Sequence, residues 1–309
     1  MNNNSINKLN SDWVTGFIDA EGCFYVRIAK SKRHKIGWWV QVYFQIGLHV
    51  RDKDLLLQIK SFFNEIGSVY KMNNKAVIYQ VRNLNEITKV IIPHFENYPL
   101  ITQKQSDFLL FKEIVKLMDK GEHLNKEGIV KIINLKASLN KGLSDKLKFD
   151  FPNTIKVERP KVNIPIAIDY NWIAGFFTGE GCFSVCIYNS RNNKNRILLR
   201  VIITQHYKDR LLIYNLMNTL KCGVISKDSN TIVLTISKFK DIYNKIIPLF
   251  NEYNIKGVKS LDFQDFYKIA KLIDKKAHLT IAGIKEIRKI KLNMNKGRYL
   301  QKEKLLLVR

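Results

Sequence analysis

Acidic residues, proline and paired cysteine are all scarce in this chain of 309 residues, which has 27 aspartates and glutamates against 52 lysines and arginines. The resulting net charge of +25 points to a polyanionic partner, nucleic acid before membrane. A genome rich in A·T pairs, whose codons favour lysine, would also make the chain basic. Both causes can act together.

Other absences narrow the class further. The four cysteines, Cys23, Cys182, Cys186 and Cys222, form no Cys-x-x-Cys pair and have no zinc-ligand spacing, so free thiols in a reducing compartment are the simplest interpretation. No apolar run approaches the ~20 residues of a membrane span. Residues 1–10 are polar and resemble neither a secretory signal nor an Arg-rich presequence, so we expect no targeting peptide.

One ten-residue pattern is present twice, at Trp13–Gly22 and Trp172–Gly181. Each copy is an apolar helical pattern that ends in a glutamate followed by glycine, the usual helix stop. In each copy two small residues stand four positions apart, a spacing that lets two helix backbones touch. These small residues are Gly16, Ala20, Gly175 and Gly179. If the two helices pair through them, Glu21 and Glu180 meet at the same end.

Such a meeting of two carboxylates is electrostatically unfavourable. Each lies near a helix C-terminus, where the macrodipole already disfavours negative charge. Two carboxylates ~4 Å apart repel by roughly 4 kcal/mol at an effective dielectric constant of about 20. A compensating cation is therefore expected, and a hard divalent ion such as Mg²⁺ suits oxygen ligands of this kind.

The two halves of the chain predict the same order of elements and an α+β fold class. After the first motif helix we expect strands at 23–30 and 38–48, a helix at 52–64, and strands at 67–72 and 76–82. Helices follow at 84–95, stopped near Pro93, and at 102–120 and 125–139. In the second half the strands are expected at 182–188, 196–204, 224–227 and 232–237, with a helix at 209–220.

The repeat indicates a duplicated domain. His123 corresponds to His278 and Asn140 to Asn295, and the offset in both cases is 155 positions. This period is far longer than that of a tandem repeat array. Segment 148–170, which holds three of the six prolines, reads as an extended linker. We therefore predict two αββαββα domains, residues 1–147 and 171–309, related by a pseudo-two-fold axis with the motif helices at their interface.

The exposed faces of the predicted sheets carry polar, aromatic and basic side chains, and no acidic residue occurs from 22 to 50. A two-stranded ribbon fits the major groove of B-DNA, so two curved sheets would form a DNA-binding saddle. A ten-residue strand follows roughly 10 base pairs, and two sheets roughly 20. A sheet face that is merely solvated is the alternative. The predicted DNA contacts are Tyr25, Arg27, Arg33, Trp39, Gln41, Tyr43, Gln45 and Arg82 in the first half and Ser184, Tyr188, Arg196, Arg200, Thr204 and Lys227 in the second. Because the two sets differ, the target should not be palindromic.

The two motif copies resemble the LAGLIDADG motif of homing endonucleases, in the single-chain form with two motifs, with the motif letters on residues 14–22 and 173–181. The resemblance extends over nearly the whole chain and is to members encoded in fungal mitochondrial introns. It implies a monomeric enzyme that hydrolyses both strands of a long, asymmetric DNA target with a divalent metal. It also implies a mitochondrial location, Mg²⁺ as the cofactor, and Ca²⁺ that binds without supporting cleavage.

The resemblance also assigns roles to residues of the motif. Glu21 and Glu180 are the implied metal ligands, although most family members carry aspartate there, and the backbone carbonyls of Ala20 and Gly179 would add to them. Asp19 has no acidic counterpart in the second motif. We therefore expect Asp19 to be a cap or a neighbour of the DNA backbone rather than a ligand.

Family members also use polar or basic side chains to order water and stabilise the reacting phosphate. Gln45 is where such a glutamine is expected, and the repeat places Ile202 at the equivalent position, so this role is not symmetric. Lys238 is a weaker catalytic candidate, as is Arg82. Phosphate anchoring or a plain solvated charge is the competing interpretation of both.

Two other functions are compatible with the same fold. The first is an intron maturase, an RNA-binding splicing cofactor whose partner would be its own intron RNA. The second is a regulator that binds DNA without cutting it. The presence of both motif glutamates favours cleavage and does not exclude maturation.

Overall fold

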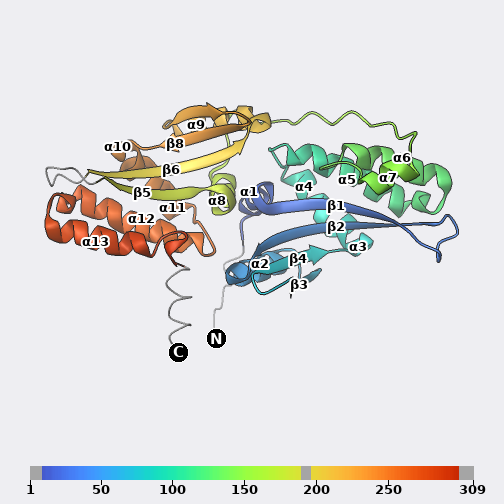
Figure 1. Ribbon diagram of the computed structural model, residues 1–309, viewed down its shortest axis with the longest axis horizontal. Coiled ribbons are helices and arrows are strands. Elements are labelled where there is room, and N and C mark those ends of the chain that lie inside the picture. Colours follow the sequence, from blue (N-terminus) through green and yellow to red (C-terminus); the bar gives the residue numbers. More distant parts are fainter. Residues whose placement is uncertain (1–8, 189–195, 299–309) are drawn as a thin grey trace. The chain divides into compact units, whose positions relative to one another are not determined.

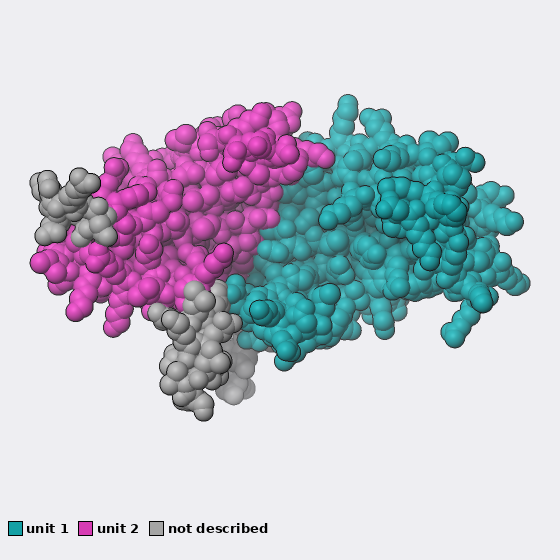
Figure 2. All heavy atoms as spheres, viewed as in Figure 1, with its two compact units in different colours: residues 1–164 teal, residues 165–309 magenta. Residues whose placement is uncertain are grey.

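The computed structural model describes residues 9–188 and 196–298 of the chain. The chain divides into two compact units, residues 1–164 and 165–309 (Figure 2). Each unit contains one four-stranded antiparallel sheet together with helices (Figure 1). The predicted α+β fold class and the duplication are therefore confirmed. The pairing of the motif helices and the saddle remain predictions.

Unit 1 begins with the motif helix α1 (Ser11–Glu21), which leads directly into strand β1 (Gly22–Lys30). The sheet is completed by β2 (Trp38–His49), β3 (Ser68–Lys71) and β4 (Ala76–Val81). The other elements are η1 (Val50–Asp52), α2 (Lys53–Phe62), α3 (Leu84–Glu86), η2 (Ile87–Ile91), α4 (Ile92–Asn97), α5 (Lys104–Asp119), η3 (Glu122–Leu124), α6 (Lys126–Ser138) and α7 (Asp145–Asp150).

Unit 2 repeats this order from the second motif helix, α8 (Tyr170–Glu180). Its strands are β5 (Cys182–Tyr188), β6 (Arg196–His206), β7 (Val224–Asp228) and β8 (Thr231–Ile236). Its other elements are η4 (Tyr207–Asp209), α9 (Arg210–Leu220), α10 (Phe239–Asp241), η5 (Ile242–Ile246), α11 (Ile247–Glu252), α12 (Lys259–Asp274), η6 (Ala277–Leu279) and α13 (Ile281–Leu292). No helix among the described residues combines the length and the hydropathy that crossing a membrane requires.

The two sheets have the same topology, with strand orders β1-β2-β4-β3 and β5-β6-β8-β7. One face of each sheet is buried under helices, and Phe24 of β1 contacts Phe108 and Phe111 of α5 with ring centroids 5.3 Å apart. In unit 2, Phe183 contacts two phenylalanines of α12 at the same distance. The alternate side chains, such as Tyr25, are exposed on the opposite face. Within the described part of each unit, one face of the sheet is therefore left free of that unit's own helices.

Pro93 does not stop its helix, which corrects the sequence prediction. The helical segment continues from α3 through the π-helical turn η2 into α4, and Pro93 lies in the first turn of α4. Proline lacks the N–H of the normal α-helical bond. The wider π turn before it accommodates that missing bond, so the chain continues without a break. Pro248 has the same position after η5 in unit 2.

The motif glycines end their helices for a reason other than the one expected. Gly22 and Gly181 have extended backbones with φ of −76° and −68°, not the left-handed conformation typical of a helix-ending glycine. A Cβ on Gly22 would lie 2.5 Å from Cγ2 of Ile18 and 2.9 Å from its carbonyl oxygen. Glycine is required because the chain turns tightly over the last helical turn. The strand therefore starts immediately after the glutamate.

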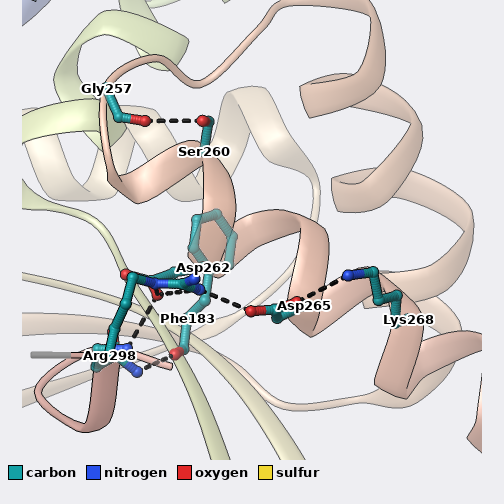
Figure 3. Close-up of polar contacts among 8 residues, drawn as sticks. Phe183, Gly257, Ser260, Asp262, Asp265, Lys268 and Arg298 are labelled. Atoms are coloured by element: carbon teal, nitrogen blue, oxygen red, sulfur yellow. Dashed lines mark hydrogen bonds and ion pairs between the residues drawn. The ribbon is translucent and has the colours of Figure 1, made fainter. Parts of the chain in front are cut away.

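An asparagine in each unit fixes the strand that follows the motif. The backbone N–H of Asn295 donates to Asp262 Oδ1 (3.0 Å), and its side-chain amide donates to the carbonyl of Phe183 (3.0 Å). Arg298 donates to the same Asp262 oxygen at 3.0 Å (Figure 3). Asn140 makes the equivalent bonds in unit 1. Both asparagines have φ of 51°, a left-handed conformation that asparagine tolerates.

Much of the predicted linker packs along unit 1. Arg159 donates to Asp107 Oδ1 (2.8 Å) and to the carbonyl of Ser138, and Ser106 donates to the carbonyl of Pro160. These bonds fasten the segment to α5 and α6. The boundary between the two compact units falls between residues 164 and 165, inside the predicted linker 148–170.

Candidate active site

Each unit places one motif glutamate at the end of its motif helix. Glu21 is the last residue of α1 and is partly buried, and Glu180 is the last residue of α8 and is exposed. Both stand where an apolar helix gives way to the first strand of a sheet. Whether the two carboxylates meet depends on how the units associate, so the shared site remains a prediction.

A lysine side chain contacts the end of each motif helix. Neither lysine was among the predicted site residues. The ammonium group of Lys104 donates to the carbonyls of Ile18 (2.8 Å) and Ala20 (3.3 Å). Lys259 donates to the carbonyl of Gly179 in unit 2. These cations satisfy helix-end carbonyls and oppose the negative end of the helix dipole.

The sequence did carry a signal for these lysines. Lys104 and Lys259 are 155 positions apart, the offset of the repeat, and they are the first residues of α5 and α12. A cation at a helix N-terminus is disfavoured by that helix's own dipole. A basic residue repeated at an unfavourable position indicates a role elsewhere, here at the neighbouring motif helix.

Asp19 is a structural cap rather than a surface residue. Its carboxylate is buried and accepts hydrogen bonds from the backbone N–H groups of Ile101 (2.9 Å) and Thr102 (3.2 Å) and from the hydroxyl of Thr102 (2.6 Å). It therefore fixes the turn that leads into α5 and hence positions Lys104. The expectation of a cap agrees with these bonds. Because the carboxylate is buried, it is not exposed to a DNA backbone. In unit 2 Thr178 occupies this position and accepts from Lys256 N–H at 3.3 Å.

The exposed face of the unit 1 sheet brings together several of the predicted DNA contacts. A hollow of about 380 Å³ is lined by Tyr25, Arg27, Tyr43, Gln45, Gln80 and Arg82. Trp39 lies under the guanidinium of Arg27 at 5.6 Å, and Gln41 donates to the backbone carbonyl of Arg82 at 2.7 Å. Arg33 is exposed in the β1–β2 turn. Gln80 was not predicted, although it lies on the same face.

The unit 2 sheet face has a different set of side chains. Tyr188, Arg196 and Thr204 are exposed, and Ser184 is partly exposed. Arg200 donates to the thiol sulfur of Cys186 at 2.9 Å. The ammonium group of Lys227 lies 4.3 Å from the ring centroid of Tyr207. The two faces therefore differ in chemistry, as the sequence predicted.

The remaining catalytic candidates, Lys238 and Gln45, belong to other elements than the motif helices. Lys238 is exposed at the start of α10, at the position equivalent to Asn83 rather than to Arg82. Gln45 pairs with Cys23 in the sheet register, and Ile202 pairs with Cys182, which agrees with the predicted asymmetry. A catalytic role for Gln45 or Lys238 remains a prediction.

Comparison with known proteins identifies the family. The model of the LAGLIDADG endonuclease family matches residues 14–115 and 173–270, one match per motif copy. The chain belongs to the LAGLIDADG endonuclease family.

Named relatives agree with this membership. A probable intron-encoded endonuclease of Neurospora crassa is 40% identical over 296 residues, which cover 92% of this chain and 64% of the relative. An uncharacterised mitochondrial protein of Saccharomyces cerevisiae is 23% identical over 96% of this chain and 63% of its own length. The chain thus spans about two thirds of the length of these relatives.

A solved LAGLIDADG homing endonuclease has the same fold. I-SmaMI bound to cleaved DNA is 42% identical, with a TM-score of 0.92 over 94% of this chain and 98% of that one. I-SmaMI has also been solved with uncleaved DNA in the presence of calcium ions, with a TM-score of 0.91.

LAGLIDADG endonucleases use divalent metals, and the donor atoms at the motif ends suit such an ion. Each helix end offers one carboxylate, from Glu21 or Glu180, and nearby backbone carbonyls, which are hard oxygen donors. The carbonyls of Ala20 and Gly179 already accept from lysine, and a carbonyl oxygen has a second lone pair for another partner. Among residues 9–188 and 196–298, no three His, Cys, Asp or Glu side chains cluster to form a self-contained metal cage.

A cysteine follows each motif glycine, close to the glutamates. Burial raises the pKa of the Cys23 thiol, and burial likewise raises the pKa of Cys182. Nearby Lys104 and Lys259 lower these pKa values without overcoming burial. Both cysteines are therefore neutral thiols at physiological pH.

Proposed function

We propose that this chain is a site-specific endonuclease that hydrolyses both strands of a long, asymmetric DNA target. The observation that carries the proposal is the duplicated helix end, where each motif glutamate is followed by a strand and accompanied by a lysine that caps the helix. Each helix end adjoins an exposed sheet face with cationic, aromatic and amide side chains. A target of roughly 20 base pairs follows from the strand lengths.

In the proposed reaction the motif glutamates hold the divalent ion, with Mg²⁺ as the natural one. The ion, when bound, activates water and steadies the leaving oxygen of the phosphodiester. The residues of the chain supply the rest. Lys104 and Lys259 keep a positive charge at each helix end, which reduces the repulsion between carboxylate and phosphate. The sheet faces hold and register the duplex.

The location and the cofactor are part of the same proposal. We place the protein in the mitochondrion, because one relative is named as mitochondrial and another as intron-encoded. Mg²⁺ should support cleavage, and Ca²⁺ should support binding alone, as the solved I-SmaMI complex with uncleaved DNA and calcium suggests for a relative.

A selection on DNA tests the proposal. The chain is incubated with randomised duplexes and with a pool of joined-exon sequences from fungal mitochondrial genes, in Mg²⁺ and separately in Ca²⁺, and cleaved ends are sequenced. We expect one long asymmetric site to be cut in Mg²⁺ and bound uncut in Ca²⁺. Glu21→Gln and Glu180→Gln should each lower cleavage at least about 100-fold with binding in Ca²⁺ retained.

Glu127→Gln is the matched control, because Glu127 is an exposed glutamate on α6. Cleavage by Glu21→Gln at the parental rate would show that the metal assignment is wrong. Specific binding without any cleavage by the parent would favour the non-cutting regulator.

A second candidate function, RNA binding, has its own supporting observation in unit 2. Helix α12 covers the sheet through Phe263 and Phe266, and α13 packs on α12, so α13 is remote from the exposed sheet face. Lys285, Lys289 and Lys291 are exposed on α13, whose end residues Ile281 and Leu292 are 90% and 60% exposed. Lysines interleaved with exposed apolar side chains suit RNA phosphates and unstacked bases.

The corresponding surface of unit 1 is partly occupied. Asn134 is the residue 155 positions before Lys289, and its side chain accepts a hydrogen bond from Ile155 of the packed linker at 3.0 Å. The packed linker therefore covers part of this helix face in unit 1.

Filter binding to the transcript that contains the chain's own reading frame tests this second function. Replacing Lys285, Lys289 and Lys291 together by glutamate should weaken RNA binding and leave DNA cleavage unchanged. The same change at Lys116, Lys120 and Lys126, exposed on the helices of unit 1, is the control. Equal losses with both triples would reduce the effect to net charge and would contradict a dedicated RNA surface.

A further inference from the structure

Two glutamines on the exposed sheet face of unit 1 are joined into one polar group. Gln45 of β2 and Gln80 of β4 are register partners, and Gln80 Nε2 donates to Gln45 Oε1 at 3.2 Å. Both line the hollow on the sheet face, and both are partly exposed. This bond fixes which atoms of each amide remain for a ligand.

The joined amides have a defined pattern of free donors and acceptors. Gln45 has its oxygen engaged and presents both N–H groups of its amide, whereas Gln80 presents its oxygen and the second N–H of its amide. In the major groove adenine offers an N7 acceptor beside an N6 donor, which this pattern complements. Guanine offers two acceptors, N7 and O6, so the Gln80 oxygen would face another oxygen.

Residues that pair across neighbouring strands form a row, and the row that contains Gln45 and Gln80 lies close to the end of the motif helix α1. Cys23, two residues after Glu21, pairs with Gln45, and Ser68 of β3 pairs with Gln80. In the register of β1, β2 and β4, this is the outward-facing row that crosses all three strands, and it begins two residues after Glu21. A base read by this row is therefore one of those closest to the motif glutamate of unit 1.

The equivalent row of unit 2 contains no glutamine or asparagine. Cys182 pairs with Ile202, Ile202 pairs with Thr235, and Thr235 pairs with Val224, which is 70% exposed. Isoleucine, valine and the methyl group of threonine form an apolar strip. Such a strip suits the C5-methyl group of thymine, the only methyl group in the major groove.

We propose that Gln45 and Gln80 act together to read an adenine near the centre of the target, and that Ile202 and Thr235 read a thymine at the corresponding position of the other half-site. The proposal rests on the DNA-binding function proposed above. It makes Gln80 a specificity-determining residue and assigns the free N–H groups of Gln45 to base readout.

A solvated sheet face is the competing explanation of the amide pair. In that case the two glutamines would bond to each other in water and contribute nothing to base preference. The difference is measurable at a single base pair, since readout changes one position of the target whereas solvation changes none.

The test is a binding profile in Ca²⁺ against duplexes that carry every single base-pair substitution of the selected target. The parent should prefer A·T at one central position by about 10-fold or more over G·C. The double variant Gln45→Ile, Gln80→Thr should lose that preference at this position and keep the preferences elsewhere. The reciprocal variant Ile202→Gln, Thr235→Gln should move the preference of the other half-site from thymine to adenine.

Gln58→Ile, an exposed glutamine on α2, is the control and should leave the whole profile unchanged. Thermal unfolding of each variant shows whether it is folded. A single variant tests the amide orientation. The carboxylate of Gln80→Glu cannot donate to Gln45, so the Gln45 amide should rotate to donate to it. Adenine binding at the same position should then weaken.

Three results would overturn the inference: a central preference for G·C, a double variant whose profile matches the parent, or losses spread evenly over the target. Because the profile is measured by binding, it also separates the inference from the proposed function. A protein that binds specifically and never cuts would refute the endonuclease and would still test the readout.

Discussion

His94 should make unit 1 sensitive to acid, and unit 2 supplies the matched control. The imidazole of His94 packs against the rings of Phe62, Phe63 and Phe95, with ring centroids 4.8–5.3 Å away. The hydroxyl of Thr15 on the motif helix donates to the Tyr98 carbonyl (3.2 Å), so the Thr15 oxygen accepts from His94 Nε2 (3.1 Å). A neutral imidazole that carries its proton on Nε2 makes this hydrogen bond without a buried charge.

Burial lowers the pKa of His94 from 6.5 to about 4. In the unfolded chain the imidazole takes up a proton near pH 6.5, whereas in the folded chain it stays neutral until about pH 4. The stabilisation is therefore present above pH 6.5 and is lost as the pH falls towards 4. Integrating the linkage relation gives a loss of roughly 2 kcal/mol in the free energy of unfolding between pH 7 and pH 4.5.

The repeat shows how the same site is built without a titrating group. Residues equivalent to Thr15 and His94 are Ala174 and Leu249, both apolar. The variant His94→Leu should thus remove most of this acid sensitivity. The double variant Thr15→Ala, His94→Leu should unfold with the shallow pH dependence of the apolar site.

Urea unfolding at pH 7, 5.5 and 4.5 measures the effect. Trp13, Trp38 and Trp39 are three of the four tryptophans of the chain, so fluorescence reports mainly on unit 1. The carboxylates titrate in the same way in parent and variant, so the difference between the two curves isolates His94. Parallel pH curves for the parent and His94→Leu would refute the assignment of a depressed histidine pKa.

Further predictions concern the helix ends and a thiol. Gly22→Ala should destabilise unit 1 by about 1–3 kcal/mol, because its Cβ would meet Ile18, whereas Gly47→Ala, whose Cβ has space, should change the urea midpoint little. Asp19→Asn should cost about 2–4 kcal/mol because a buried acceptor of three hydrogen bonds is weakened; an unchanged midpoint would contradict the cap. Burial raises the pKa of Cys222 to about 11, so its alkylation, followed by mass spectrometry, should still be accelerating above pH 10, and a plateau near pH 9 would exclude this shift.

The sequence by itself determined the fold class and the duplication, and it singled out the two motif glutamates, whose role as metal ligands stays a prediction. An apolar helical pattern ending in Glu-Gly, found twice, is a local signal, and the alternation along β1 and β2 fixes which side chains face outward. Pro93 was misjudged because its effect depends on the turn before it, and the π turn η2 has no reliable signature in the sequence. The glycine after each motif was predicted correctly as a helix end and for the wrong steric reason.

Only the tertiary structure decided which distant side chains serve the motif. Lys104 reaches α1 across 84 positions, and Asp19 fixes the turn before α5 across 82, contacts that no local pattern encodes. The pairing of Gln45 with Gln80 depends on strand register, which alternation alone leaves open by steps of two residues. The order of residues determines which side chains the motif carries. The hydrogen bonds that orient these side chains form only when strands and helices far apart in the chain pack together.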